Sequence, residues 1–220
     1  MELVCLSDTH GAHEDVGVPE GDVLIHAGDF CQEGRLEEVE PFLDWFGNQP
    51  CDEKILVAGN HDGAFEDENI RGTARAWASE VATYLEDKST TIGGRLFYGS
   101  PWILKDDDWA FMKPEQQLVR IWENIPTETD VLITHGPPRG MMDLFERKVE
   151  SAGDQGQFRS ERIGSVSLRD AIERVQPAVH VFGHNHFDYG TVRTNETMFI
   201  NASLPKGRKG ITHEPVVVEI

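Results

Sequence analysis

The chain has 220 residues, of which 39 are acidic and 20 are basic, so its formal net charge is −19. This length suits one ordinary domain whose core needs no disulfide support, and we expect a single domain over residues 1–220. So negative a chain repels the phosphate backbone of nucleic acids, which argues against a general nucleic-acid-binding role.

The cysteines and the apolar segments bear on where the protein works. Cys5, Cys31 and Cys51 form no Cys-x-x-Cys pair, which is typical of reduced thiols rather than of a disulfide framework or a structural zinc site. The N-terminus lacks the basic start and long apolar stretch of a signal peptide. No uncharged apolar run approaches the roughly 20 residues of a membrane span. We therefore expect a cytoplasmic protein that does not act at a membrane.

In chain order, short apolar segments rich in β-branched residues alternate with segments of helical periodicity. Each apolar segment leads into Gly or polar residues, which predicts buried strands over 3–6, 23–26, 55–58, 131–134 and 179–182. Two further strands are predicted near the C-terminus, over 198–201 and 216–219. Strands that alternate with helices indicate an α/β architecture.

Three of the intervening segments have apolar residues at helical spacing. The first covers 39–46 and tolerates Pro41 if the helix begins near Glu37, because amides of the first turn have no partner within the helix. The second covers 74–85, and the third covers 168–175. Ser165 or Ser167 could cap the third helix.

Five predicted strands lead into turns that carry Asp, Asn or His. Sites in α/β folds assemble at the carboxyl ends of strands, so we expect these side chains to lie close together. Asp, His and Asn without Cys suit divalent ions such as Mn²⁺, Fe²⁺, Co²⁺ or Zn²⁺. The candidates are too many for one ion and suit two ions about 3.5–4 Å apart that share a carboxylate. They are Asp8, His10, Asp29, Asn60, His135, His184 and His186.

These residues form an ordered set of motifs that resembles the calcineurin-like metallophosphoesterases. The blocks D-x-H, G-D, G-N-H-[ED], H-G and G-H-x-H all occur, in that order, between residues 3 and 201. More narrowly, the chain is similar to the small metallophosphoesterase-domain-containing proteins, whose vertebrate brain members are linked to cyclic-nucleotide phosphodiester hydrolysis. The resemblance implies a four-layer αββα sandwich of two mixed β-sheets flanked by helices. The dinuclear metal site would then lie at the C-terminal ends of the strands.

The resemblance also implies a role for each motif residue. Two divalent ions would share Asp29, with Asp8, His10 and His186 at the first ion and Asn60, His135 and His184 at the second. Mn²⁺ is the first expectation, with Fe²⁺, Zn²⁺, Co²⁺ or Ni²⁺ as alternatives.

Five residues are expected to act on the substrate or to orient a residue that does. His61 would protonate the leaving oxygen, and Asp62 would orient His61. Asn60 and His184 would add polar contacts to the phosphoryl group. Arg139 follows a ligand loop and is a candidate phosphate contact.

The implied reaction is hydrolysis of a cyclic or other small nucleotide phosphodiester by a hydroxide that bridges the two ions. The expected partner is a small phosphoester or nucleotide and not a long nucleic acid. A phosphomonoesterase is the alternative, since the same core does not dictate the type of ester. A protein-binding scaffold is disfavoured because every ligand candidate and His61 are present. A protein phosphatase is also disfavoured, since no Arg follows soon after the Gly28-Asp29 block.

Other residues near the motifs have a structural and a functional interpretation. His26 and His180 lie inside apolar strands and are expected to be core histidines behind the ligands. Phe30, Trp102 and Phe187 could stack on a base or belong to the core. Segments 63–115 and 139–165 are expected to form most of the rim over the metals and to set specificity.

Overall fold

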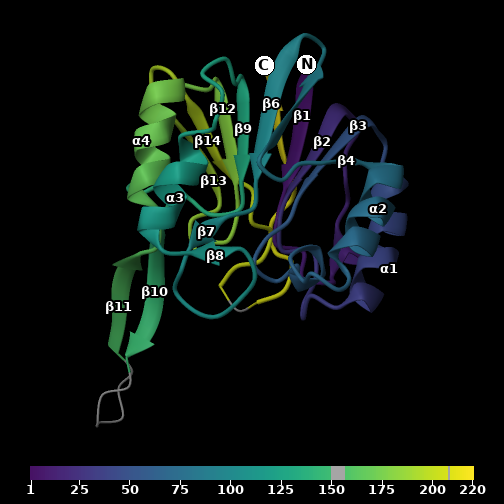
Figure 1. Ribbon diagram of the computed structural model, residues 1–220, viewed down its shortest axis with the longest axis horizontal. Coiled ribbons are helices and arrows are strands. Elements are labelled where there is room, and N and C mark those ends of the chain that lie inside the picture. Colours follow the sequence, from purple (N-terminus) through teal and green to yellow (C-terminus); the bar gives the residue numbers. More distant parts are fainter. Residues whose placement is uncertain (150–156, 208) are drawn as a thin grey trace.

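Two large β-sheets lie face to face at the centre of the molecule, with helices on both outer faces (Figure 1). The computed structural model describes residues 1–149, 157–207 and 209–220. The first sheet has the strand order β15–β1–β2–β3–β4, and only β15 is antiparallel to its neighbour. Its strands are β1 (Glu2–Leu6), β2 (Gly21–Ala27), β3 (Cys51–Val57), β4 (Thr83–Tyr84) and β15 (Val216–Glu219).

The second sheet has the order β13–β14–β12–β9–β6–β5, with four parallel strands inside and one antiparallel strand at each edge. Small two-stranded ribbons are formed by β7 (Ile103–Leu104) with β8 (Met112–Lys113), and by β10 (Leu144–Val149) with β11 (Gln157–Arg162). The β10–β11 hairpin projects from the body of the molecule (Figure 1). The strands of the second sheet are β5 (Lys88–Ile92), β6 (Arg95–Ser100), β9 (Val131–Thr134), β12 (Val179–Phe182), β13 (Gly190–Arg193) and β14 (Met198–Asn201).

The parallel strands are apolar on both faces because both faces are covered, one by the other sheet and one by helices. In β1, Leu3 and Cys5 point into the layer between the sheets, whereas Val4 and Leu6 point toward the helices of the first sheet. Val131 and Ile133 of β9 meet this inner layer from the second sheet. Because alternate residues of a strand point to opposite faces, one apolar layer forms between the two sheets and another forms between each sheet and its helices. The ends of the strands lie outside these layers and can carry polar residues.

Two pairs of helices complete the four layers. α1 (Leu36–Gly47) and α2 (Arg71–Val81) cover the first sheet, and α3 (Glu115–Trp122) and α4 (Val166–Val175) cover the second (Figure 1). Two short 3₁₀ helices, η1 (His13–Asp15) and η2 (Gly63–Phe65), belong to the loops of the first sheet. The predicted four-layer αββα sandwich is therefore confirmed.

The predicted elements agree with the structure in most places, and two details differ. All seven predicted strands are present. The helix predicted over 74–85 ends at Val81, and Tyr84 lies in β4 because that segment pairs with the edge of β3. Pro41 lies in the second turn of α1 rather than the first, so it removes one backbone donor inside the helix. Ser165 is the cap of α4, since its Oγ accepts the Leu168 amide at 3.1 Å.

The structure also bears on the expectations for the cysteines and for membrane spans. Cys5, Cys31 and Cys51 are buried and unpaired. None of the helices in the described parts of the chain has the length and apolar content that crossing a bilayer requires.

Candidate metal centre

The seven predicted ligands gather where the carboxyl ends of strands from both sheets meet. Asp8 and His10 follow β1, Asp29 follows β2, and Asn60 follows β3, all from the first sheet. The second sheet supplies the rest from the turns after β9 and β12, namely His135, His184 and His186. These residues come together because the strands of each sheet that carry them run parallel, so their carboxyl ends lie at the same edge.

Asp29, Asn60 and His135 form one half of the centre. The His135 Nδ1 donates to the Ala27 carbonyl at 2.8 Å, so the neutral ring carries a lone pair on Nε2. That Nε2 lies 3.0 Å from Asn60 Oδ1 and 3.2 Å from Asp29 Oδ2. With a neutral ring, three acceptor atoms face one another, so the group calls for positive charge, which a proton on Nε2 supplies when no metal is bound. This donor set fits a divalent cation.

Asp8, His10 and His186 form the other half by the same logic. The His186 Nδ1 donates to the Gly207 carbonyl at 3.0 Å, which leaves Nε2 as the acceptor. His186 Nε2 lies 3.3 Å from Asp8 Oδ1 and 3.3 Å from His10 Nε2. A second cation fits among these atoms.

Asp29 lies between the two halves. The Asp29 carboxylate lies near His135 and His184 on one side and near His10 and His61 on the other. Within each of these two groups, the candidate ligand atoms all lie within 4.8 Å of one another. Its Oδ2 is 3.9 Å from His10 Nε2 and 3.2 Å from His135 Nε2. A carboxylate in this position can bridge two ions, which is the role that the resemblance implies for Asp29.

The electrostatics of the ligand cluster call for positive charge. Burial favours the neutral carboxyl of Asp8, yet the His186 hydrogen bond and charge keep the pKa of Asp8 below its ordinary value. Burial alone would lower the pKa of His135, but the Asp29 carboxylate raises that pKa to about 9. Burial lowers the pKa of His184 to about 4, which keeps the imidazole neutral and able to act as a ligand. Buried carboxylates that draw protons onto neighbouring rings would hold metal cations in the same way.

The backbone at the ligands adopts an uncommon conformation. Asp8, His10, Asp29 and His184 have φ values of 60, 44, 57 and 64 degrees, in the left-handed region that few non-glycine residues occupy. Such conformations persist where neighbouring structure holds them. Here the Asp8 amide donates to the Gly28 carbonyl at 2.9 Å, and the His10 amide donates to the Asp29 carbonyl at 3.0 Å. The turns after β1 and β2 therefore fix each other.

Gly183 explains how the second sheet reaches Asp8. A Cβ at this position would overlap the Ser7 hydroxyl and a carboxylate oxygen of Asp8. The adjacent His184 amide donates to both Asp8 carboxylate oxygens, at 3.1 and 3.0 Å. The glycine of the G-H-x-H block thus allows the turn after β12 to pack directly on a ligand from β1.

His26 and His180 support the ligand turns from behind. His26 accepts the Gly28 amide on Nδ1 at 3.2 Å, so its Nε2 donates to Thr9 Oγ1 at 3.1 Å. Both rings are fully buried, and burial lowers the pKa of each to about 3.

His180 holds Thr134 in the same manner, next to the ligand His135. The Thr134 hydroxyl donates to the Gly136 carbonyl at 2.8 Å, so its oxygen accepts from His180 Nε2 at 2.9 Å. The expectation that His26 and His180 are core histidines behind the ligands is confirmed.

The structure places His61 beside the ligands and gives Asp62 a different task from the predicted one. The Asp62 carboxylate accepts backbone amides of Asp29 at 2.8 Å, Gly59 at 2.7 Å and Cys31 at 2.9 Å, so it braces the ligand turns. The His61 ring is oriented instead by the Gln32 carbonyl, which accepts from Nδ1 at 2.7 Å. Residue types carried no signal of this contact, because the acceptor is a backbone carbonyl.

The ligands open into a pocket of about 770 Å³. Its walls include Trp109, Phe145, Glu146, Phe187 and Lys209. Trp109 and Glu146 come from the two segments expected to form the rim, while Lys209 comes from a loop near the C-terminus.

Of the three aromatic residues weighed from the sequence, one lines the pocket. Phe187 does so and is 40% exposed. Phe30 is buried and stacks on Phe42, and Trp102 packs against Phe111. Trp109 was not predicted, since a single exposed aromatic residue in a charged loop has no distinguishing pattern in the sequence.

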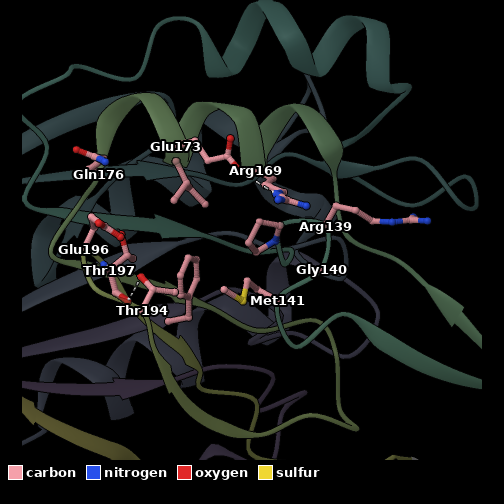
Figure 2. A pocket seen from close by; sticks show the side chains of 12 residues that line it. Arg139, Gly140, Met141, Arg169, Glu173, Gln176, Thr194, Glu196 and Thr197 are labelled. Carbon is pink, nitrogen blue, oxygen red and sulfur yellow. Dashed lines mark hydrogen bonds and ion pairs between the residues drawn. The ribbon is translucent and has the colours of Figure 1, made fainter.

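Arg139 lies at a different cavity from the metal ligands. This cavity, of about 320 Å³, is formed by residues of α4, β14 and the loops beside them (Figure 2). Figure 2 shows the Arg139 guanidinium pointing away from the cavity, and its Nη1 donates to the Arg162 carbonyl at 3.2 Å. Arg169 at the same cavity is paired with Glu173 at 3.0 Å. Asn60 and His184, the other two predicted substrate contacts, do line the metal pocket.

Comparison with solved structures shows the fold. One solved structure superposes with a TM-score of 0.64 at 15% identity and covers 91% of this chain and 89% of its own. Another, from Thermus thermophilus, has a TM-score of 0.57 at 13% identity and covers 91% and 88%. At these identities the likeness concerns the fold alone.

Comparison with known sequences shows the family. Human metallophosphoesterase domain-containing protein 1 is 35% identical over 240 residues, which cover 99% of this chain and 70% of the human protein. A UPF0046 protein of Caenorhabditis elegans is 36% identical over 231 residues, which cover 100% of this chain and 75% of that protein. The family model described as Calcineurin-like phosphoesterase matches residues 1–188. The chain therefore belongs to the calcineurin-like phosphoesterases, a family of phosphoric ester hydrolases that typically bind two divalent metal ions.

Proposed function

We propose that this protein is a dinuclear-metal-dependent phosphodiesterase that acts on cyclic or other small nucleotide phosphodiesters. The observation that carries the proposal is the position of Asp29 between two donor groups, with the His61 ring beside it. Family membership supports the ester chemistry, and the diester preference is our inference. The same ligands would serve a phosphomonoesterase, which is therefore an outcome of the test below.

The two donor sets support a separate group of ligands for each proposed ion. Mixed imidazole, carboxylate and amide donors without sulfur suit divalent ions of this series, and we propose Mn²⁺, with Fe²⁺, Zn²⁺, Co²⁺ or Ni²⁺ as alternatives. When bound, two such ions lower the pKa of a water and neutralise charge on a phosphoryl group. Asp29 would be common to both. The first ion would be held by Asp8, His10 and His186, and the second by Asn60, His135 and His184.

His61 is placed to give a proton to the leaving oxygen. Its Nδ1 is committed to the Gln32 carbonyl, which fixes the ring and leaves Nε2 for the substrate. The ring packs against His10 with centroids 4.6 Å apart. The His61 amide also donates to Asp29 Oδ1 at 2.7 Å, so the proton donor and the shared ligand keep a fixed distance. A positioned general acid contributes typically about 10²–10⁴-fold to the rate.

The pocket suits a small substrate. A volume of about 770 Å³ lies within the range of small-molecule sites. The charge of −19 repels long polyanions, whereas a small phosphoester can reach a site made locally positive by metal ions. We propose that Asn60 and His184 also contact the phosphoryl group. The three unpaired cysteines support our proposal of a cytoplasmic location.

The first test compares four substrate classes with Mn²⁺ added: an aryl phosphodiester, an aryl phosphomonoester, and 2′,3′- and 3′,5′-cyclic nucleotides. We expect turnover of the diesters that depends on metal and exceeds turnover of the monoester. Asp29→Asn should reduce turnover by more than the roughly 10–100-fold typical of residues that only support ligands.

Asp170→Asn is the matched control, because Asp170 is an exposed carboxylate on α4, outside the pocket. No turnover of any substrate, or full activity of Asp29→Asn, would refute the proposal that the protein is a metal-dependent phosphoesterase. If the monoester is hydrolysed faster than the diesters, the proposed function becomes that of a phosphomonoesterase.

A further inference from the structure

The loop that orients His61 is held from behind by a carboxylate of α1. Gln32, whose carbonyl accepts the His61 Nδ1 hydrogen at 2.7 Å, lies in the loop between β2 and α1 and lines the metal pocket. Glu38 lies in the first turn of α1. Its carboxylate accepts the backbone amides of Gln32 at 3.0 Å, Glu33 at 3.1 Å and Arg35 at 2.9 Å. The loop before α1 thus folds around this one side chain.

A single peptide group connects the Glu38 carboxylate to the His61 ring. The Gln32 carbonyl and the Glu33 amide belong to the same planar group, in which the C=O and N–H point in opposite directions. The Glu33 amide donates to both carboxylate oxygens of Glu38, each at 3.1 Å. The carboxylate therefore fixes the direction in which the Gln32 carbonyl meets His61. It also polarises this carbonyl, because hydrogen bonds in a chain strengthen one another.

The same loop packs directly against the turn that carries His61. Gly34 has a φ of 74 degrees, and a Cβ at this position would lie 2.5 Å from the Gly63 nitrogen and 2.6 Å from the His61 carbonyl oxygen. The missing side chain allows the two segments to touch. Backbone packing thus sets the distance between the loop and the turn, while Glu38 holds the peptide group that faces the ring.

The charge of Glu38 strengthens this arrangement. Burial favours its neutral form, but hydrogen bonds from the amides of Arg35, Glu33 and Gln32 lower the pKa of Glu38 below its ordinary value. Hydrogen bonds to a charged acceptor are stronger than those between neutral groups. Glu37 is an exposed acid in the same turn of α1, yet the loop amides donate to Glu38 instead. The two neighbouring acids therefore have different roles in the loop.

We propose that Glu38 is a positioning residue for the proton donor, which fixes the orientation of His61 through the peptide group between Gln32 and Glu33. This inference rests on the phosphodiesterase activity proposed above and on the role of His61 in it. It extends the machinery to a side chain that touches neither the ligands nor the substrate. Because the connection runs through His61, loss of the carboxylate should matter only for reactions that need the His61 proton.

The test compares a 3′,5′-cyclic nucleotide, whose leaving alkoxide needs a proton, with a nitrophenyl diester, whose phenolate leaves without one. Both are assayed with Mn²⁺ added. Glu38→Ala should lower kcat on the cyclic nucleotide by roughly 10- to 100-fold, as loss of the orienting partner of a histidine does at metal sites, and leave the nitrophenyl diester within about twofold. Glu38→Gln should recover part of the loss, since its amide oxygen still accepts an N–H. Glu37→Ala is the matched control, because it removes an acid from the same turn of α1.

A double variant shows whether Glu38 acts through His61. In the His61→Ala background, Glu38→Ala should cause no further loss on the cyclic nucleotide, because no ring remains to be oriented. A further loss as large as that in the unaltered protein would show that the carboxylate acts on another group, and it would overturn the proposal. Bound metal and the thermal midpoint of each variant confirm that it is folded.

The outcomes separate this inference from the proposed function. Equal losses on both substrates, or lost metal, would show that Glu38 only supports the ligand turns and would overturn the positioning role. Unchanged kinetics of Glu38→Ala, while His61→Ala loses activity on the cyclic nucleotide, would overturn that role alone and leave the proposed function in place. If the unaltered protein hydrolyses neither diester with metal present, the phosphodiesterase proposal fails, and the positioning role fails with it.

Discussion

At the scale of single residues, the centre depends on which nitrogen of each histidine is committed to the backbone. Carbonyl acceptors hold Nδ1 of His135, His186 and His61, at Ala27, Gly207 and Gln32. Each ring therefore presents Nε2 on the side away from that carbonyl. We propose this nitrogen of His135 and His186 as a metal ligand, and that of His61 as the proton donor. The chemical role of each ring follows from what surrounds its second nitrogen.

His61→Ala should show this difference in role through the leaving group. We expect a loss of about 10²–10⁴-fold on a cyclic nucleotide, whose alkoxide needs a proton, and a much smaller loss on a nitrophenyl diester, whose phenolate leaves without one. Steady-state kinetics on the two substrates measures the difference, and bound metal should stay unchanged. His213→Ala is a control, since His213 stacks on Tyr189 outside the pocket. Similar losses on both substrates, or lost metal, would contradict the role of His61.

At the scale of elements, the site is a set of turns that pack on one another. The turns after β1 and β2 exchange backbone hydrogen bonds through Asp8 and His10, and the Asp62 carboxylate joins the turns after β2 and β3. The turn after β12 enters this assembly through Gly183. A change in one turn is therefore transmitted to ligands on the others.

Gly183→Ala tests this packing directly. The added methyl group would overlap Ser7 and Asp8, so the turn must shift away from the ligand. We expect a loss of about 1–3 kcal/mol in the free energy of unfolding, together with weaker metal binding. Gly72→Ala is the matched control, because a Cβ at Gly72 in α2 meets nothing within 4 Å. Chemical denaturation and bound-metal measurements provide the readout, and unchanged metal affinity in Gly183→Ala would contradict the expected coupling.

Features that depend on residue type could be predicted from the sequence, whereas features that depend on contacts between distant residues could not. Apolar runs predicted the strands, because strands covered on both faces must be apolar throughout. The helix α3 was missed, since in eight residues it buries only Leu118 and Trp122, too few for a periodic signal. The gathering of the candidate ligands was predicted from their side-chain types, whereas the bracing role of Asp62 and the Gln32 contact depend on backbone groups that residue types do not encode.

At the scale of the whole molecule, stability is expected to depend on pH through buried neutral histidines. Burial lowers the pKa of His180 from 6.5 to about 3, while in the unfolded chain the ring titrates near 6.5. Below pH 6.5 the unfolded state therefore binds a proton that the folded state does not. Stability is lost as the pH falls from about 6.5 toward 3, and each such histidine contributes about 2 kcal/mol between pH 7 and pH 5.

His180→Leu should remove one such contribution. Urea unfolding at pH 7 and pH 5 should show a smaller loss for the variant than for the unaltered protein, by about 2 kcal/mol. The metal ligands titrate in both proteins, so their contribution cancels in the comparison. Thr134 loses its His180 partner at both pH values, so only the difference in stability between the two pH values tests the assignment. Equal losses in both proteins would show that His180 does not titrate as its burial implies.

The division of ligands between the sheets also has a mechanical consequence. Asp8, Asp29 and Asn60 follow strands of one sheet, and His135 and His186 follow strands of the other, so each proposed cation would be a crosslink between the two halves of the sandwich. Sliding or rotation of one sheet against the other would change the spacing of the ions themselves. The apolar layer between the sheets fixes how far apart the sheets lie, and it would therefore fix the distance between the two ions. None of its side chains lines the pocket.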